Sequence, residues 1–478
     1  MAQAQSRYRL SGAERAMLQG TWPLGLLDDR AREPRIVESA EEFLREVLVG
    51  EHLEDFDFVV LPKGTELLAL SWEDCLPDDI RAALRDCNSA TDFARQLRAR
   101  PEVVERYRAD IEYVDRKRQQ RDILRKDKLE LGKRIDEAIR MAAAGEADAD
   151  LLYIAEMRLR VEAPHPLGGE GVKTVCRRDV KDVLGPYASW TLYWDRYDEG
   201  FFAGGARSGK GLHVDQVLWS NVGKNWSGHK LIAAWPPGEV SKQVALELYD
   251  VLLSPPLSER ELQVLGMAAK VVLIRPGDVY LFSGGVAHAV LCVSDEICLG
   301  AYESLVTLHP KHVAHFLRTS DSEGPFCLDK YSMDEKEFRD TKDDCIDQLE
   351  DAAAQLAQGG PASAPVPLAG PCASAAPALW RGLLAALHSD DGLQRTLRDH
   401  YASCVALCAA DAYFRQNLPQ RVLHAAAACG WRGAAAAAPK RRRLLLGGGG
   451  AAQATSDSTS SEDDAPSSCV PRTGGCTI

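Results

Sequence analysis

The sequence contains a His-x-Asp triplet, His213-Val-Asp215, whose spacing suits metal binding. In a β-strand, residues i and i+2 point to the same face, so this imidazole and this carboxylate could bind one ion together. Two further His-x-acid triplets begin at His52 and His388, but their surroundings are helical, and i and i+2 do not share a helix face. Because any single triplet is more often an ordinary surface or core histidine, a metal site needs a third ligand.

His288 is the candidate third ligand. It lies 75 residues after His213, at the start of another expected strand. Two histidines and one carboxylate form a facial triad that leaves coordination positions open, which is the ligand set of non-haem Fe(II) oxygenases. The alternative is that His288 only caps a buried strand. A rival cluster, His309, His312 and His315, is spaced by three residues, which would spread its imidazoles across a helix face.

Lys230 opens the apolar run 230–235 and lies 17 residues after His213. A lysine at the head of a buried strand is costly unless its ammonium meets an anion. A dicarboxylate that chelates iron through its oxo-acid end would leave its second carboxylate for Lys230 to neutralise. The alternative is a lysine at a strand end whose side chain reaches solvent.

The elements that must position these residues are short β-type runs within 151–308, separated by Gly, Pro and Asp turns. The expected strands are 190–194, 230–235, 271–274, 279–282, 289–293 and 297–302. Residues 275–278, Arg-Pro-Gly-Asp, form a turn between two of them. Strands at this spacing predict a sandwich or barrel, interrupted by a helical insertion over 245–270.

The flanking regions differ in composition from this core. The composition and charge spacing of residues 1–150 predict a mixed, partly helical region. It has a strand at 58–61 and a long charged helix, or helical pair, over 102–146. We expect that helix to pack on its own domain rather than form a coiled-coil dimer. Downstream we expect a helical extension over 309–357, a Pro/Ala/Gly linker over 358–378, a helical segment over 379–432 and a disordered tail over 433–478.

Composition limits the class of partner and the compartment. The 478 residues carry 57 Lys+Arg against 70 Asp+Glu, a net charge of −13 that disfavours a general nucleic-acid-binding surface. Thirteen cysteines without a Cys-x-x-Cys pair disfavour a disulfide framework and a cysteine zinc site. No run reaches ~18 apolar residues and the N-terminus lacks a signal-peptide core, so we expect no membrane span and a nuclear or cytoplasmic location.

In their order along the chain, these motifs resemble those of the jumonji-C (JmjC) Fe(II)/2-oxoglutarate oxygenases. The matching segments are Leu151–Ile154, Arg207–Asp215, Ser227–Lys230, Pro276–Asp278 and Gly284–His288. The family shows Arg-Ser-Gly-Thr-Gly-Ile-His-Ile-Asp at the first iron-binding motif, with Gly-His-Lys at the same 17-residue offset. The resemblance covers about residues 151–305 and is nearest to the nuclear branch described both as arginine demethylases and as lysyl hydroxylases.

The resemblance implies a mainly β fold with flanking α-helical segments, whose core, 151–308, is a double-stranded β-helix or cupin-like jelly roll. His213, Asp215 and His288 would bind Fe(II). With 2-oxoglutarate as cosubstrate and O2 at the open position, such an enzyme hydroxylates or N-demethylates a lysine or arginine side chain of a protein. The co-products are succinate and CO2.

The resemblance also implies a cosubstrate site. Lys230 and Tyr153 would bind the distal carboxylate of 2-oxoglutarate, and Ser220 or Asn221 would add a polar contact. Lys210 stands where the family often has a threonine that contacts the cosubstrate, so its ammonium would either pair with the same carboxylate or obstruct the site.

Two further departures from the family pattern follow. Gly300 stands where a threonine is expected, and Val286 and Ala287 replace two aromatic residues, which would widen the pocket. Two alternatives therefore remain: a catalytically silent cupin-like binding or scaffold module, and an oxygenase of a small metabolite. The sequence sets no oligomeric state.

Overall fold

The structure is a computed structural model. It describes residues 8–50, 52, 56–100, 103, 110–115, 120–123, 140, 152–158, 198–215, 219–249, 251–306 and 378–393. The strand expected at 190–194, the helical extension over 309–357, most of the linker, the histidines of 309–315 and the tail over 433–478 lie outside the described residues. No helix in the described ranges is long and apolar enough to cross a membrane.

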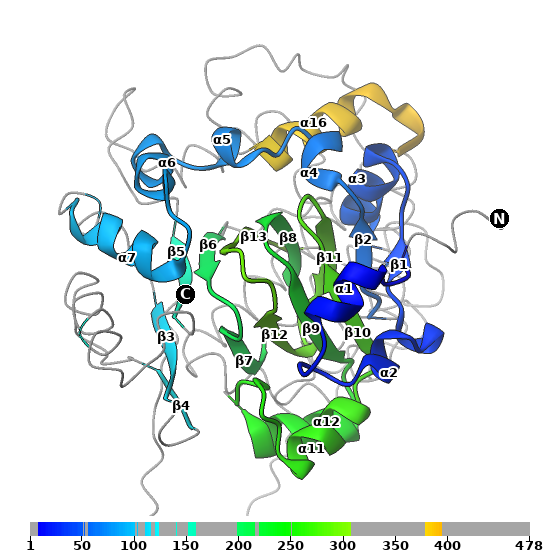
Figure 1. The fold of residues 1–478 in the computed structure, drawn as a ribbon. Coiled ribbons are helices and arrows are strands. Elements are labelled where there is room, and N and C mark those ends of the chain that lie inside the picture. Colours follow the sequence, from blue (N-terminus) through cyan, green and yellow to red (C-terminus); the bar gives the residue numbers. More distant parts are fainter. Residues whose placement is uncertain are drawn as a thin grey trace, which may run out of the picture.

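Strands of the described residues form two sheets (Figure 1). The larger sheet has the order β1-β2-β11-β8-β13-β6-β5-β3-β4, and the smaller has the order β10-β9-β12-β7. The larger sheet consists of β1 (Arg35–Ile36), β2 (Val59–Leu61), β3 (Asp110–Asp115), β4 (Gln120–Ile123), β5 (Tyr153–Arg158), β6 (Asp198–Gly204), β8 (Trp219–Ser227), β11 (Val279–Ser283) and β13 (Cys298–Val306). The smaller consists of β7 (Gly209–Val214), β9 (Lys230–Trp235), β10 (Lys270–Ile274) and β12 (Ala287–Cys292).

An apolar core joins the two sheets. Ile232 and Val290 of the smaller sheet share one buried cluster with Tyr280 and Phe282 of the larger sheet. Phe58, just before β2, stacks on Phe282 with ring centroids 5.3 Å apart. Every residue of β9 and of β12 is buried, because helices and loops cover the other face of the smaller sheet. The expected mainly β core with flanking helices is confirmed for this part of the chain.

Helices cover the outer faces of the sheets. They are α1 (Gly12–Met17), α2 (Leu24–Leu27), the 3-10 helix η2 (Arg30–Arg32), α3 (Ala40–Val49), α4 (Gly64–Leu67), α5 (Trp72–Cys75), α6 (Asp78–Leu84), α7 (Ala90–Arg98), α11 (Glu239–Leu248), α12 (Glu259–Gly266) and α16 (Ala378–Ser389). Ser11 and Ser258 start α1 and α12 as capping boxes with Glu14 and Glu261. The cluster outside the smaller sheet includes residues of α11, α12 and the N-terminal segment.

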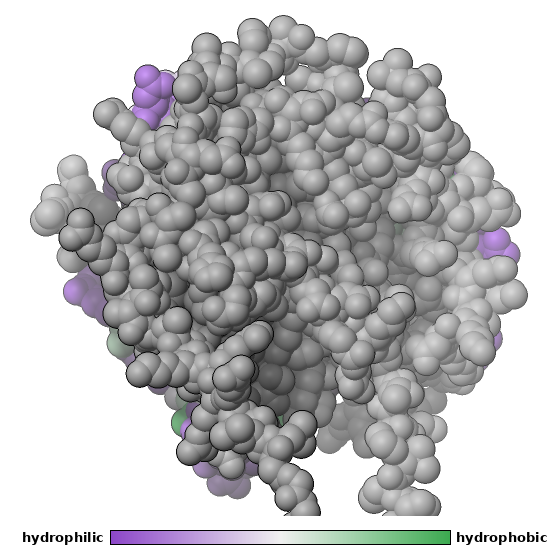
Figure 2. Space-filling view, turned by 180° about the vertical axis from the view of Figure 1, so that it is seen from behind, coloured by the Kyte–Doolittle hydropathy of each residue, from purple (hydrophilic) through white to green (hydrophobic). Residues whose placement is uncertain are grey.

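Several predicted elements are confirmed. The expected strands at 58–61, 230–235, 271–274, 279–282, 289–293 and 297–302 correspond to β2, β9, β10, β11, β12 and β13. The helical insertion corresponds to α11 and α12, and α16 begins the helical segment predicted over 379–432. On the face in Figure 2, the described residues that reach the surface are mostly hydrophilic.

The helix predicted over 102–146 is wrong at residues 110–115 and 120–123, whereas the described residues 103 and 140 are helical. Residues 110–115 and 120–123 are instead the antiparallel pair β3–β4, and β3 also pairs with β5. The charge spacing favours a helix, but Ile111, Tyr113 and Val114 suit a strand, and the exposed edge of β5 supplies backbone partners for it. Strands from the region 1–150 therefore extend the larger sheet at both ends.

Candidate metal centre

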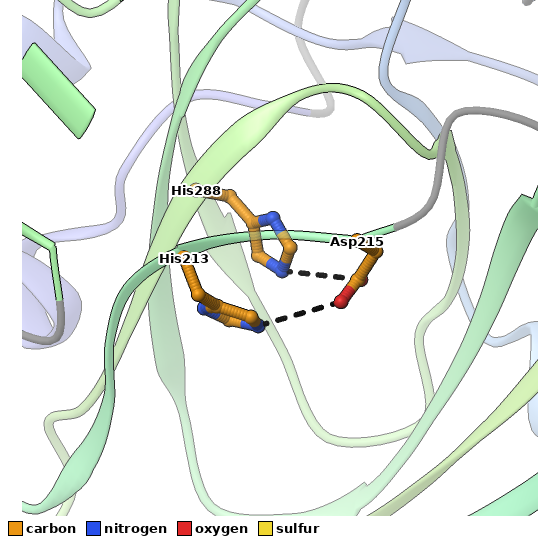
Figure 3. Close-up of side chains that lie close together, drawn as sticks. All are labelled: His213, Asp215 and His288. Atoms are coloured by element: carbon orange, nitrogen blue, oxygen red, sulfur yellow. Dashed lines mark ion pairs between the residues drawn. The ribbon is translucent and has the colours of Figure 1, made fainter. Parts of the chain in front are cut away.

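His213, Asp215 and His288 converge at one end of the smaller sheet (Figure 3). One ligand atom of each residue lies within 4.8 Å of the others. Asp215 Oδ1 is 3.8 Å from His213 Nε2, and Asp215 Oδ2 is 3.7 Å from His288 Nε2. The three residues that the sequence predicts as ligands are thus brought to one point.

The pairing of two neighbouring strands produces this convergence. His213 of β7 and His288 of β12 are direct partners in the antiparallel register, and their ring centroids are 4.1 Å apart. Directly opposed residues project to the same face of a sheet. Asp215 follows β7 by one residue, and its carbonyl oxygen accepts a hydrogen bond from Gly285 N at 2.9 Å. The i, i+2 spacing therefore acts as the sequence predicts, although the carboxylate lies just past the strand end.

Backbone carbonyls fix the orientation of both imidazoles. Nδ1 of His213 lies 2.7 Å from Gly211 O, and Nδ1 of His288 lies 2.9 Å from Val286 O. Because a carbonyl only accepts, each Nδ1 carries the proton and each Nε2 presents its lone pair to the cluster. Histidines that bind a metal usually donate their other ring N–H to a carbonyl or carboxylate in this way. Two neutral Nε2 atoms and one carboxylate fit Fe(II) or another first-row divalent ion.

The electrostatic surroundings favour the neutral form of His213. Its burial is the main cause that lowers the pKa of His213, to about 3, and the neighbouring His288 and Lys210 lower it further. Neutral imidazole is the form that binds a metal, so protons do not compete at His213 near pH 7.

Asn221 of β8 holds the carboxylate of the cluster. Its Nδ2 donates a hydrogen bond to Asp215 Oδ2 at 2.6 Å. The sequence predicts Asn221 as a cosubstrate contact, whereas the structure gives it a contact with a candidate ligand. β8 belongs to the larger sheet, so this hydrogen bond ties the metal cluster to the opposite sheet.

Ser220 precedes Asn221 on β8 and faces the other side of the strand, and the polar contact predicted for it at the cosubstrate stays a prediction. Consecutive strand residues point to opposite faces. The Ser220 hydroxyl lies 3.2 Å from His52 Nε2, and His52 Nδ1 is 3.4 Å from Glu46 Oε1. These contacts pin the end of α3 to β8 from outside. Glu46 and His52 carry no distinguishing motif in the sequence.

Lys210 points into the sandwich because β7 contains an irregularity. Lys210 pairs with Val290 while His213 pairs with His288, so three steps on β7 match two steps on β12. In a regular strand, a spacing of three would place Lys210 and His213 on opposite faces, but the irregularity brings both inward. The Lys210 side chain is buried and its charge acts on His213. Whether Lys210 pairs with the cosubstrate carboxylate or obstructs the site stays a prediction.

Lys230 is buried on the same inner face, farther along the smaller sheet. It pairs with Cys292 of β12, which lies four residues, or about 13 Å, from His288 along the strand. The Lys230 side chain is 1% exposed, and among the described residues its ammonium has no hydrogen bond or ion pair. A Cβ at Gly300 would lie 2.9 Å from Lys230 Nζ, so the glycine leaves room for the ammonium. A buried ammonium without an ion-pair partner is costly unless an anionic ligand binds beside it.

Aromatic residues line the interior near both groups. Tyr153 and Phe202 belong to one buried cluster with Cys292 and Cys298, next to Lys230, and Tyr302 packs against it. Tyr302 accepts a hydrogen bond from the Tyr280 hydroxyl. Burial raises the pKa of Tyr302, and Asp215 and Cys292 raise it further, which puts Tyr302 near both the metal cluster and the Lys230 end. Tyr153 thus lies near the strand partner of Lys230, and its contact with the cosubstrate stays a prediction. Tyr302 was missed because one aromatic residue in a strand resembles any other core residue.

No protein-family model matches the chain, and no curated protein matches its sequence.

Proposed function

We propose that the chain is an Fe(II)- and 2-oxoglutarate-dependent oxygenase of the JmjC type. The observation that carries this proposal is the combination of two sites on one inner face. The His213–Asp215–His288 cluster offers a facial set of metal ligands. The buried ammonium of Lys230, which has no hydrogen bond or ion pair with any described residue, lies along the same sheet.

The strand order supports a double-stranded β-helix for the core. The eight consecutive strands β6 to β13 divide between the two sheets, with β13 between β6 and β8 in one sheet and β12 between β7 and β9 in the other. Strands that are distant in sequence thus become neighbours, which is the pairing of a jelly roll. In this arrangement β7 and β12 bring the two histidines together.

The residues present fit the cofactor and the cosubstrate that the proposal requires. His213, Asp215 and His288 would hold Fe(II), and Lys230 with Tyr153 would hold the distal carboxylate of 2-oxoglutarate. The separation of about 13 Å between the strand positions of His288 and Lys230 leaves room for a five-carbon diacid and an extended lysine side chain. When bound, Fe(II), 2-oxoglutarate and O2 supply the oxidising power that hydroxylates a C–H bond.

The protein contributes position and a dry environment. The Gly211 and Val286 carbonyls fix the two imidazoles, and Asn221 fixes the carboxylate. Lys230 neutralises the diacid in an interior where a charge pair is stronger than in water. Phe282, whose ring centroid is 4.7 Å from that of His288, shields the cluster from the core side.

We further propose a protein side chain, lysine or arginine, as the substrate. Support comes from the motif resemblance and from the small residues Val286 and Ala287 before His288. Hydroxylation of an N-methyl group on such a side chain would release formaldehyde and leave the demethylated amine. A nuclear or cytoplasmic location is part of the same proposal.

An anaerobic titration tests the proposal. The full chain is titrated with Fe(II) and then with 2-oxoglutarate, and the visible spectrum is recorded. We expect a metal-to-ligand charge-transfer band in the wild type and no band in His213→Ala. Succinate release with a peptide library, compared with a metabolite extract, then separates a protein substrate from a small one. Absence of the band in folded protein contradicts the proposal.

A second candidate, a catalytically silent binding module, is favoured by one observation. The Lys210 side chain is buried and its ammonium lies close to His213. There its positive charge opposes the binding of a metal cation. Iron binding without a charge-transfer band would support this module. Lys210→Thr separates the two, because it restores the band only if Lys210 obstructs the cosubstrate.

A further inference from the structure

Two cysteines lie beside Lys230 that the proposed reaction does not use. Cys292 ends β12 and Cys298 begins β13, so the two residues belong to different sheets. Both are free thiols with no exposed surface. Cys292 is the direct strand partner of Lys230, and Cys298 lies two residues before Gly300, whose Cα faces the Lys230 ammonium.

The two thiols interact within one buried cluster that also contains Tyr153, with Cys292 as donor to the Cys298 sulfur. The Cys298 thiol also donates to the His229 carbonyl at 3.3 Å and lies 3.7 Å from the Ser294 hydroxyl. A disulfide needs its sulfurs at about 2.05 Å and its Cβ atoms at about 3.8 Å, so the two thiols must approach each other to form one.

The surroundings make Cys298 the more reactive thiol. The hydrogen bond from Cys292 is the main cause that lowers the pKa of Cys298, and the Lys230 ammonium lowers it further. The pKa of Cys292 is raised well above its ordinary value, because the same hydrogen bond and burial favour its thiol form. A thiol of lowered pKa next to a thiol of raised pKa is the arrangement of an attacking and a resolving cysteine.

We propose that Cys292 and Cys298 form a redox pair that a hydroperoxide converts into an intramolecular disulfide in the wall of the Lys230 pocket. The Cys298 thiolate attacks the peroxide, the O–O bond breaks, and the leaving oxygen departs as water or alcohol. This step leaves a sulfenic acid on Cys298. The Cys292 sulfur then attacks the Cys298 sulfur, the S–S bond forms, the S–O bond breaks, and hydroxide leaves as water with the Cys292 proton. The two electrons lost by the thiols reduce the peroxide.

The disulfide would change the shape of the cosubstrate site. It would join the two sheets where Lys230 and Gly300 meet, and so shift the walls around the ammonium. This part rests on the proposed function, which requires the same pocket to open to a dicarboxylate and hence to a peroxide. We therefore expect weaker 2-oxoglutarate binding in the oxidised protein.

Peroxide oxidation of the full chain, without iron or 2-oxoglutarate, tests the pair. Samples are alkylated at intervals, and disulfides are mapped by mass spectrometry of peptides. We expect the Cys292 and Cys298 thiols to disappear together with a loss of about 2 Da, and to return with dithiothreitol. In Cys292→Ser we expect Cys298 to gain oxygen instead of forming a disulfide.

Cys87 is the internal control. It is more exposed than either member of the pair, but burial raises its pKa to about 11, with Asp92 contributing. If exposure alone set reactivity, Cys87 would oxidise first, whereas the proposal requires Cys292 and Cys298 to precede it. The proposal is overturned if both remain alkylatable after Cys87 is oxidised, or if either pairs with another cysteine. Because this mapping uses no iron, its outcome is independent of the charge-transfer titration.

Discussion

The two oxygens of Asp215 face different histidines, and a single amide keeps them there. Asp215 follows a strand end and its side chain is 37% exposed, so the backbone alone leaves its carboxylate free to rotate. The hydrogen bond from Asn221 Nδ2 at 2.6 Å removes that freedom. The imidazoles have their own anchors in Gly211 O and Val286 O. The carboxylate is therefore the ligand whose geometry depends most on one side chain.

Asn221→Ala should weaken metal binding without removing a ligand. The loss of this hydrogen bond lets Asp215 leave the position between the two Nε2 atoms. We expect the dissociation constant for Fe(II) to rise about 10–100-fold, the usual effect of losing a residue that orients a ligand. Anaerobic calorimetric titration measures it.

Ser220→Ala is the matched control for that variant. Ser220 is the preceding residue of β8, but its hydroxyl contacts His52 on the opposite face. We expect its Fe(II) affinity to equal that of the wild type. Equal affinity in both variants would mean that Asn221 has no role in orienting Asp215.

Gly300→Ala should affect the cosubstrate and not the metal. The added Cβ would lie 2.9 Å from Lys230 Nζ and 2.5 Å from Lys224 O, so the ammonium must move and the strand must shift slightly. We expect 2-oxoglutarate affinity to fall about 10–100-fold, the value of one charge-assisted hydrogen bond. The Fe(II) affinity should stay within twofold, roughly the scatter of a single interaction.

Gly25→Ala controls for the substitution itself, because a Cβ at Gly25 meets nothing within 4 Å. Both ligands are titrated into each variant, and thermal unfolding corrects for any loss of stability. A parallel loss of iron and 2-oxoglutarate affinity in Gly300→Ala would show a general distortion and contradict a role confined to the Lys230 end.

At the scale of elements, β8 shows what the sequence hides. Its segment 219–227 contains Asn, Gly and Lys and lacks an apolar alternation, so no strand was expected there. Neighbouring strands restrict which residue types fit in β8. A Cβ at Gly223 would lie 2.2 Å from Tyr280 Cζ, so only glycine fits beneath that ring. Lys224 and Glu303 form a buried ion pair between β8 and β13. Such partners come from distant segments, and local patterns do not contain them.

The turn before β11 is clear in the sequence, yet its electrostatics depend on packing. Asp278 closes the turn by accepting a hydrogen bond from Arg275 N at 2.9 Å. Burial raises the pKa of Asp278 to about 6, and Glu14 raises it while Arg275 opposes the rise. Between the ordinary carboxyl pKa of about 3.9 and about 6, the folded state holds a proton that the unfolded state releases. The stability contribution of this carboxyl is therefore present at low pH and is lost as pH rises through 6.

Asp278→Asn should remove that pH dependence. From pH 4 to pH 7, we expect the unfolding free energy of the variant to gain about 2–3 kcal/mol relative to the wild type, since a shift of one pKa unit is worth 1.36 kcal/mol. Urea denaturation across this range measures the difference. Asp295→Asn, an exposed position between β12 and β13, is the control and should run parallel to the wild type. Parallel curves for Asp278→Asn would place this carboxyl in a solvated environment.

At the scale of the whole molecule, the candidate site was more predictable than the framework around it. Burying a polar or charged side chain without a partner costs free energy, so such side chains in apolar runs are informative. This applies to His213, Asp215, His288 and Lys230. The joining of β1 to β4 onto the larger sheet was not predicted, because it depends on which sheet edges are open. The irregularity in β7 that turns Lys210 inward was also invisible, since it exists only in the pairing with β12.

The metal cluster links parts of the molecule that unfolding separates, so metal binding should stabilise the whole fold. His213 and His288 are 75 residues apart in sequence, and Asn221 couples their cluster to the larger sheet. An ion that binds only the folded chain adds about 2.7 kcal/mol to the unfolding free energy at 100 times its dissociation constant. Mn(II), a redox-stable substitute for Fe(II), should therefore raise the urea midpoint. Mg(II), which prefers oxygen ligands, should leave it unchanged.

Asp215→Asn keeps the shape of the side chain and removes its charge, so the Mn(II) effect should largely disappear. Equal stabilisation of this variant and the wild type would place the bound ion elsewhere in the chain.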